Sequence, residues 1–180
     1  KDYARNDARL AGMYVPYWTY DADTTTRYQG ERGDDYQVQE TYRAIENGKE
    51  VERVRIVTKT RWTPAAGTVS RFFDDVLVLA SRSLPRDVTE RLEPWDLANL
   101  TPYREEYLSG FQSEMYGVEL EQGFERAREL MAPVIRRDVE HDIGGDHQRI
   151  HAQDTRYGEI RFKHVLLPVW LSAFRFRDKT

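Results

Sequence analysis

The chain has 180 residues, of which 39% are hydrophobic, 12% aromatic and 32% charged, a composition that excludes a disordered polymer. Its net charge of −4 provides no global basic field that would draw the whole chain onto nucleic acid or anionic lipid. The sequence has no cysteine, which excludes disulfides, thiolate metal sites and cysteine nucleophiles. No run approaches the ~18 apolar residues that a membrane span needs.

The chain is expected to form one domain over residues 1–180 and to be a piece of a longer protein. Its length suits a single domain with a real core. It begins at Lys1 without a methionine, shows no signal peptide and stops inside the alternating run FRFRDKT. We therefore expect a cytoplasmic module, whose partner and oligomeric state the sequence leaves open.

Two similar phrases stand near the ends of the chain, YVPYW at Tyr14–Trp18 and LLPVW at Leu166–Trp170. Proline cannot donate a hydrogen bond to a sheet, which favours an edge position or a strand start for Pro16. In each phrase the proline and the tryptophan are two residues apart, so in a strand they share a face. The phrases predict two matched structural strands, with Trp18 and Trp170 both largely buried.

A β-hairpin is predicted around Asn47-Gly48, which stands between two alternating runs. Asn-Gly is a strong signal for a two-residue hairpin turn. The turn sets the register so that Glu40 faces Arg55 across the two strands. Because neither face of these strands is strongly apolar, the hairpin is expected to project from the body or to cover only part of the core.

The middle of the chain carries core candidates, a short helix and an aromatic loop. Phe72-Phe73 and Val76–Leu79 are the core candidates. Ser83 and Pro85 predict a short helix over residues 86–93. The stretch PWDLANLTPYREEYLSGF that follows is rich in turn formers and aromatic residues, so irregular structure is expected there.

A long amphipathic helix is predicted over about residues 119–143, where apolar residues recur at spacings of three and four. Gly144-Gly145 should stop it, and Pro133 should kink it. Two strands are expected after the helix, Tyr157–Leu166 and Leu167–Arg177. Strands, one long helix and strands again predict the α+β class with a mainly antiparallel sheet.

The stretch EHDIGGDHQRIH contains four candidate metal ligands: His141, Asp142, His147 and His151. His147 and His151 are four residues apart, so on a helix they would share a face, as in many zinc sites. However, Gly144-Gly145 breaks the helix before His147, and the H-E-x-x-H motif is absent. The competing interpretation is a capped helix end followed by a polar loop.

Acidic pairs are a weaker signal for chemistry. Asp21 and Asp23 stand in YDAD, and Asp74-Asp75 stands in FFDD. Two carboxylates can bind a divalent cation or act as acid and base. Aspartates are also common in turns and at helix N-termini, so the ordinary structural role is favoured.

The C-terminal strands suggest a nucleic-acid surface as an alternative. Arg161, Lys163, Arg175 and Arg177 are interleaved with aromatic residues, and single strands bind to surfaces that combine basic and stacking side chains. The competing interpretation is an ordinary alternating strand, in which the aromatic side chains face the core and the arginines face solvent.

The chain lacks the motifs of nucleotide-driven and hydrolytic enzymes. It contains no G-x-x-x-x-G-K-[ST] phosphate loop, no G-x-G-x-x-G and no G-x-S-x-G. Helicase or ATPase activity is therefore not expected of this chain.

The phrases YVPYWTYDADTTTRYQGERGD, LEPWDL, IGGDHQRIH and FKHVLLPVWLSAFRFRDKT resemble a bacterial family, and the resemblance runs through nearly the whole chain. Its members carry the names "primosomal protein N′ (replication factor Y), superfamily II helicase" or "zinc-ribbon domain-containing protein". The resemblance implies cysteine-pair zinc ribbons upstream of this region and, in some members, an apolar tail that would associate with a membrane. Zinc is thus expected only in the missing upstream part, and no cofactor in this chain.

Three hypotheses about function follow. The first is a non-enzymatic interaction or scaffold module of a larger zinc-ribbon protein, whose aromatic strands and hairpin hold a protein partner. The alternative is a nucleic-acid accessory module linked to replication. The third is a metal-dependent enzyme that uses His147 and His151.

Overall fold

The computed structural model describes residues 11–46, 48–84 and 95–171 of the chain. Its elements are strands β1 (Ala11–Glu46) and β2 (Lys49–Leu79), the 3-10 helices η1 (Leu97–Asn99) and η2 (Glu105–Leu108), strand β3 (Gln112–Ser113), helix α2 (Leu120–Ile143) and strand β4 (His147–Leu171). A sheet with one long helix agrees with the expected α+β class. The short helix predicted over residues 86–93 lies outside the described residues.

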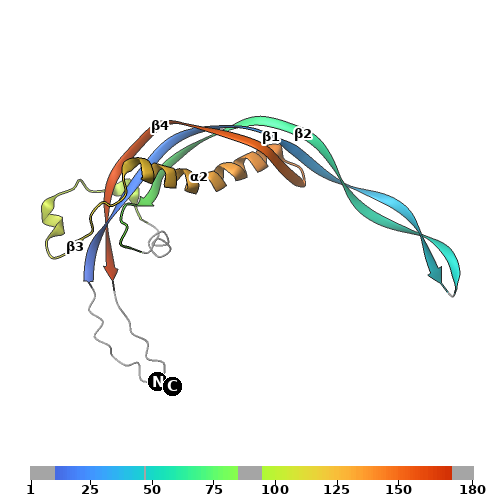
Figure 1. Cartoon of the computed structure of the whole chain (residues 1–180), viewed down its shortest axis with the longest axis horizontal. Helices are drawn as coiled ribbons and strands as arrows, with labels where there is room; N and C mark the ends of the chain where they lie inside the picture. The colour runs from blue at the N-terminus through green and yellow to red at the C-terminus, as the bar shows by residue number, and fades with distance from the viewer. Residues whose placement is uncertain (1–10, 47, 85–94, 172–180) are drawn as a thin grey trace, which may run out of the picture. The chain divides into compact units, whose positions relative to one another are not determined.

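Strand β1 is the strand with which all others in the described sheet pair (Figure 1). β3 runs parallel to β1, with Met13 opposite Gln112. β2 follows β1 after a connection of only two residues, which requires antiparallel pairing. The sheet is therefore mixed and contains antiparallel neighbours.

Strand β4 corrects the prediction of two strands over Tyr157–Leu166 and Leu167–Arg177, because it is one strand that begins at His147. Thr155 lies beside Thr26 of β1, with their hydroxyl oxygens 2.9 Å apart. For the stretch that ends at His151, a polar loop after the capped helix was the competing interpretation, whereas residues 147–156 are part of the strand. They form a strand because pairing is a backbone interaction, and most of their side chains face solvent.

The chain divides into two compact units. The first consists of Lys1–Ala22, Phe73–Met131 and Glu159–Thr180, and the second of Asp23–Phe72 and Ala132–Gly158. β1 and α2 contribute to both units. The expectation of a single domain over residues 1–180 stays a prediction.

The core of the first unit gathers apolar side chains from β1, β2 and β4. Its buried members are Met13, Val15, Tyr17, Leu79, Val165, Leu167 and Val169. The opposite face of β1 is also covered here. Trp18 is 6% exposed, and its indole Nε1 donates to the carbonyl of Val118 at 2.9 Å. β1 is thus buried on both faces in this unit.

Pro16 lies inside this buried strand, so the prediction of an edge position or strand start was wrong. Its carbonyl accepts a hydrogen bond from the amide of Ala80 at 2.9 Å, just after β2 has ended at Leu79. The next carbonyl on the same side, that of Tyr14, accepts from the amide of Glu114 at 3.0 Å. Proline is tolerated because its missing amide falls where one partner strand of β1 stops and another begins.

The two proline–tryptophan phrases have different environments, which corrects half of the tryptophan prediction. Trp18 is buried as expected, whereas Trp170 is 63% exposed. Proline and tryptophan do share a face in each phrase, since Pro168 is exposed beside Trp170. The buried face of β4 is the opposite face, which carries Val165, Leu167 and Val169. The core candidate Phe72 is likewise 57% exposed.

Helix α2 begins one residue after the predicted start and ends at the predicted residue, Ile143. Its fully covered side chains follow a spacing of four residues: Ala127, Met131, Ile135, Val139 and Ile143. Such an i, i+4 row is the ridge by which helices pack on their neighbours. Pro133 lies inside the helix, and the kink predicted there stays a prediction.

In the second unit the last turns of α2 lie against one face of the sheet. Val139 and Ile143 bury Tyr28 of β1 together with half-buried residues of β2 and β4. The Tyr28 phenol donates to Asp142 Oδ2 at 2.5 Å, and Arg71 of β2 forms an ion pair with Asp138. The ion pair holds the pKa of Asp138 below its usual value. Packing and polar contacts together hold this part of the helix in place.

We expect Gly30→Ala to destabilise the protein by about 2 kcal/mol or more, because a methyl group there would lie 2.1 Å from the carbonyl oxygen of Arg149. A backbone atom of a paired strand cannot move aside without breaking the pairing. Gly158→Ala is the matched control, since a methyl group at Gly158 meets nothing within 4 Å. Chemical denaturation of both variants checks the difference, and equal midpoints would contradict the close approach of β4 to β1.

Two buried tyrosines predict a loss of stability at alkaline pH. Burial raises the pKa of Tyr20 and of Tyr28 from 10.0 to about 12. The folded state therefore favours the neutral phenols, and this contribution is complete below pH 10 and disappears as the pH rises towards 12. Tyr28→Phe should flatten the alkaline decline while lowering stability at pH 7 by about 1 kcal/mol, through the lost hydrogen bond to Asp142.

Phenolate absorbance followed against pH checks this expectation. The same titration in denaturant is the control, because the unfolded chain should ionise near the ordinary tyrosine pKa. Coincident titration curves in the folded and unfolded states would contradict it.

Candidate functional site

The second unit contains a two-stranded ribbon, formed by residues 36–46 of β1 and 49–61 of β2. β4 begins at His147 and α2 ends at Ile143. In Figure 1 neither element continues along the ribbon. The turn residue Asn47 lies outside the described residues, while Gly48 has the positive φ of 76° that a tight turn uses.

One face of the ribbon presents aliphatic side chains to solvent. Val54 and Ile56 are 63% and 66% exposed, and Ile45 is 77% exposed. Val54 and Ile56 are two residues apart on β2, so their side chains share a face. Contiguous exposed aliphatic side chains mark surfaces that bind other proteins, and Val54 and Ile56 are the neighbouring pair of this face.

Several other side chains of the ribbon are held by contacts with charged groups. Arg55 lies 5.4 Å from the ring centre of Tyr42, and Arg61 lies 5.1 Å from that of Tyr36. Glu40 pairs with Arg55 at 3.2 Å, as the hairpin register predicts, and with Lys59 at 2.7 Å. Hydrogen bonds from Lys59 and then from Arg55 lower the pKa of Glu40. These contacts stiffen the ribbon without covering its aliphatic face.

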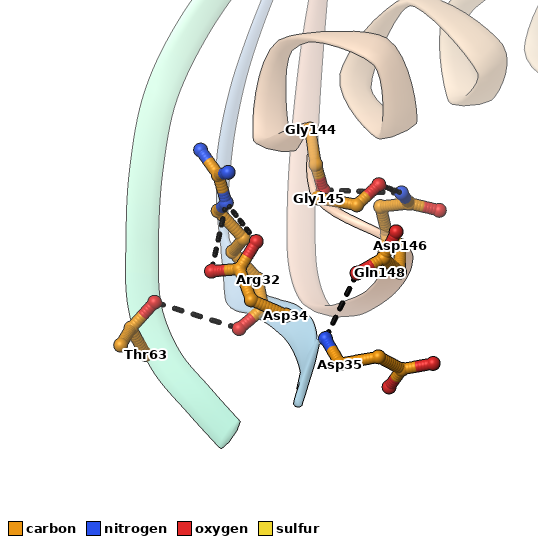
Figure 2. A network of polar contacts seen from close by, with 8 residues as sticks. All are labelled: Arg32, Asp34, Asp35, Thr63, Gly144, Gly145, Asp146 and Gln148. Carbon is orange, nitrogen blue, oxygen red and sulfur yellow. Dashed lines mark hydrogen bonds and ion pairs between the residues drawn. The ribbon is translucent and has the colours of Figure 1, made fainter. Parts of the chain in front are cut away.

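A polar network ties the root of the ribbon to the turn between α2 and β4, as Figure 2 shows. The amide of Asp35 donates to Asp146 Oδ2 at 2.8 Å, and the amide of Asp146 donates to the carbonyl of Gly33 at 2.8 Å. Gly144 and Gly145 adopt positive φ angles of 67° and 77°, so the chain reverses within two residues after the helix. The predicted glycine stop is confirmed, and it serves to place Asp146 against β1.

The candidate histidines flank this root but take separate partners. His147 Nε2 lies 3.1 Å from Asp35 Oδ2, and His151 Nε2 lies 3.3 Å from Glu31 Oε2. Both are on strand β4 rather than on a helix, and four residues of strand span about 13 Å. The pKa of Asp35 is lowered, first by a hydrogen bond from Thr60 and then by His147. Each histidine thus lies beside a different carboxylate of β1, and the His147 ring also lies 6.3 Å from that of Trp62, centre to centre.

The other two predicted metal ligands lie at the end of α2. His141 is exposed in the last helical turn, where a positive charge suits the helix dipole. Asp142 accepts the phenol hydrogen bond of Tyr28 and so belongs to the helix contact described above.

Among the described residues, one group of three carboxylates brings its oxygen atoms within 4.8 Å of one another: Asp21, Asp74 and Asp75. The sequence singled out Asp21 with Asp23 and Asp74 with Asp75 as separate pairs, and in the structure Asp21 joins the second pair. Lys163 Nζ lies 2.8 Å from Asp75 Oδ1, and the amide of Asp75 donates to Asp21 Oδ1 at 2.9 Å. The hydrogen bond to Asp75 raises the pKa of Lys163. The ammonium group of Lys163 therefore already neutralises part of the charge of these carboxylates. The hydrogen bond from its amide to Asp21 helps to hold Asp75 at its positive φ of 49°.

The described basic residues of the nucleic-acid alternative, Arg161 and Lys163, lie on the face of β4 opposite to Phe162. Arg161 and Lys163 alternate along β4 with Phe162, which is 51% exposed, and successive strand residues point to opposite faces. Lys163 also stands among the three carboxylates. Arg175 and Arg177 lie outside the described residues.

We expect Asp146→Ala to loosen the root of the ribbon, because the Asp35 amide loses its acceptor. Hydrogen exchange at the Asp35 amide should accelerate about tenfold or more. Asp154→Ala, at an exposed aspartate of β4, is the matched control. Unchanged exchange in Asp146→Ala would show that the network does not hold the root.

The chain matches no protein-family model and no solved structure. It is similar to the "Uncharacterized protein YdjG" of Bacillus subtilis (strain 168), with 24% identity over 177 residues. The match covers 93% of this chain and 46% of that protein, so the chain spans less than half the length of this relative. No helix among the described residues is long and apolar enough to cross a membrane.

Proposed function

We propose that this chain is a non-enzymatic protein-interaction module, and that its ribbon projects from the second unit and binds a partner protein. The observation that carries the proposal is the exposure of Ile45, Val54 and Ile56, each more than 60% open to solvent. Burying one such side chain fully contributes about 1.5–3 kcal/mol. A partner that covers this face would gain that free energy, which the isolated chain leaves unused.

The construction of the ribbon supports the same proposal. An isolated two-stranded hairpin is only marginally stable in water. Here it is stiffened by the ion pairs of Glu40 and the aromatic contacts of two arginines, and its root is fixed by Asp146. A rigid ribbon loses little conformational freedom on binding, which favours affinity. Its free β1 edge could also accept a strand of the partner.

The same module would belong to a larger bacterial zinc-ribbon protein, as the family resemblance implies. A match to less than half of a longer Bacillus subtilis protein is what such a module would produce. The non-enzymatic part of the proposal rests on the sequence, which lacks cysteine and the motifs of nucleotide-driven enzymes.

The nucleic-acid alternative has weaker support. Single-strand binding needs cations and stacking rings on one surface, whereas Arg161 and Phe162 point to opposite faces of β4. Binding to single-stranded DNA, measured at two salt concentrations, separates the two functions. Strong binding at low salt that weakens steeply at high salt would favour the alternative, because phosphate contacts release counterions.

Photocrosslinking tests the ribbon directly. We expect a photoreactive amino acid at Ile56 to yield one predominant protein adduct in a lysate of the source cells. The same amino acid at Thr68, exposed on β2 outside the ribbon, is the matched control and should not yield that adduct. Unlabelled wild-type protein should compete the adduct away.

The variant Val54→Asp/Ile56→Asp should compete about tenfold less well, because two charges would have to be buried in the contact. Both positions are exposed, so the variant is expected to keep its fold, which circular dichroism can check. Equal competition by wild type and variant, or the same adduct from Thr68, would contradict the proposal.

A further inference from the structure

The first unit contains an open groove that the interaction surface does not use. Its volume is about 890 Å³, and it lies between the sheet and the segment 99–116. Tyr14 of β1 and residues 164–168 of β4 line it from the sheet. Small-molecule sites in proteins occupy roughly 300–1,000 Å³. The groove therefore has the size of a ligand site.

Four tyrosines line this groove: Tyr14, Tyr103, Tyr107 and Tyr116. They come from β1, from the segment before η2, from η2 itself and from the segment after β3. Tyr103 and Tyr107 are 65% and 44% exposed, so much of their ring surface is open. The Tyr116 ring packs against His164, with ring centres 4.3 Å apart, which fixes one wall.

The charge of the groove has one sign. Among the described residues that line it, Glu114 is the only carboxylate, and none is a lysine or an arginine. Glu114 is half-buried and accepts a hydrogen bond of 3.3 Å from the Ser81 hydroxyl. Burial lowers the pKa of His164, which disfavours a positive charge on this imidazole. An anionic ligand would find no cation here, whereas a cationic ligand would find a carboxylate.

Aromatic faces together with a carboxylate recognise organic cations. The face of a tyrosine ring attracts an ammonium group electrostatically, and sites for quaternary ammonium ligands are lined by several such rings. The apolar side chains of Leu100 and Leu166 in the same groove would accept the hydrocarbon part of such a ligand. We propose that this groove binds an alkylated ammonium compound, with the cation against the tyrosines and near Glu114.

Choline and its neutral isostere, in which carbon replaces the nitrogen, are the probes for this proposal. NMR titration of the full chain should show saturable binding of choline, with the isostere bound about tenfold more weakly. Equal affinity for both probes would overturn the proposal, because the groove would then be apolar without charge selectivity. Absence of saturable choline binding would overturn it as well.

Four variants locate the binding. Glu114→Gln should weaken choline binding about fivefold, and Glu119→Gln, at an exposed glutamate outside the groove, is the matched control. Tyr103→Leu should weaken binding similarly, while Tyr103→Phe should retain it because the ring face remains. Binding that is unchanged in both Glu114→Gln and Tyr103→Leu would place choline elsewhere and overturn the assignment. The ribbon lies in the other unit, so this test is independent of the proposed protein partner.

Discussion

The structure depends on the hydrogen-bonding requirement of one long strand. β1 has 36 residues, and every other strand in the described sheet pairs with it. Buried backbone amides and carbonyls need partners, so where β1 is buried the end of one neighbouring strand is followed by another partner. The replacement is visible beside Pro16, where the amides of Ala80 and Glu114 take over from β2. The short strand β3 exists because the edge of β1 would otherwise remain open.

The two proposed binding features arise where the partners of β1 change or stop. In the second unit β4 begins beside Asp35, so residues 36–46 have β2 as their paired neighbour and form a ribbon. In the first unit β3 contributes only two residues, and the segment leading to it forms one wall of the tyrosine groove. Where strand pairing with β1 is incomplete, the side chains have no core in which they could be buried. These side chains are therefore accessible to ligands.

The charged groups that first suggested chemistry are largely occupied with one another. His147 and His151 pair with Asp35 and Glu31, and Lys163 pairs with Asp75. A metal or substrate would have to displace these partners before it could bind. The exposed aliphatic side chains of the ribbon and the tyrosines of the groove are instead open to solvent, and the two binding proposals rest on them.

By itself the sequence determined the helix, its glycine stop and the shared face of proline and tryptophan, because each depends on spacing within a few residues. Only the tertiary structure decided which face was covered. Trp18 is buried because a second layer lies on that side of β1, whereas Trp170 faces solvent. The same holds for the polar residues 147–156, which became a strand by pairing, and for Asp21, which meets Asp74 and Asp75 across the sheet. Local periodicity specifies an element, but burial and clustering depend on residues distant in the chain.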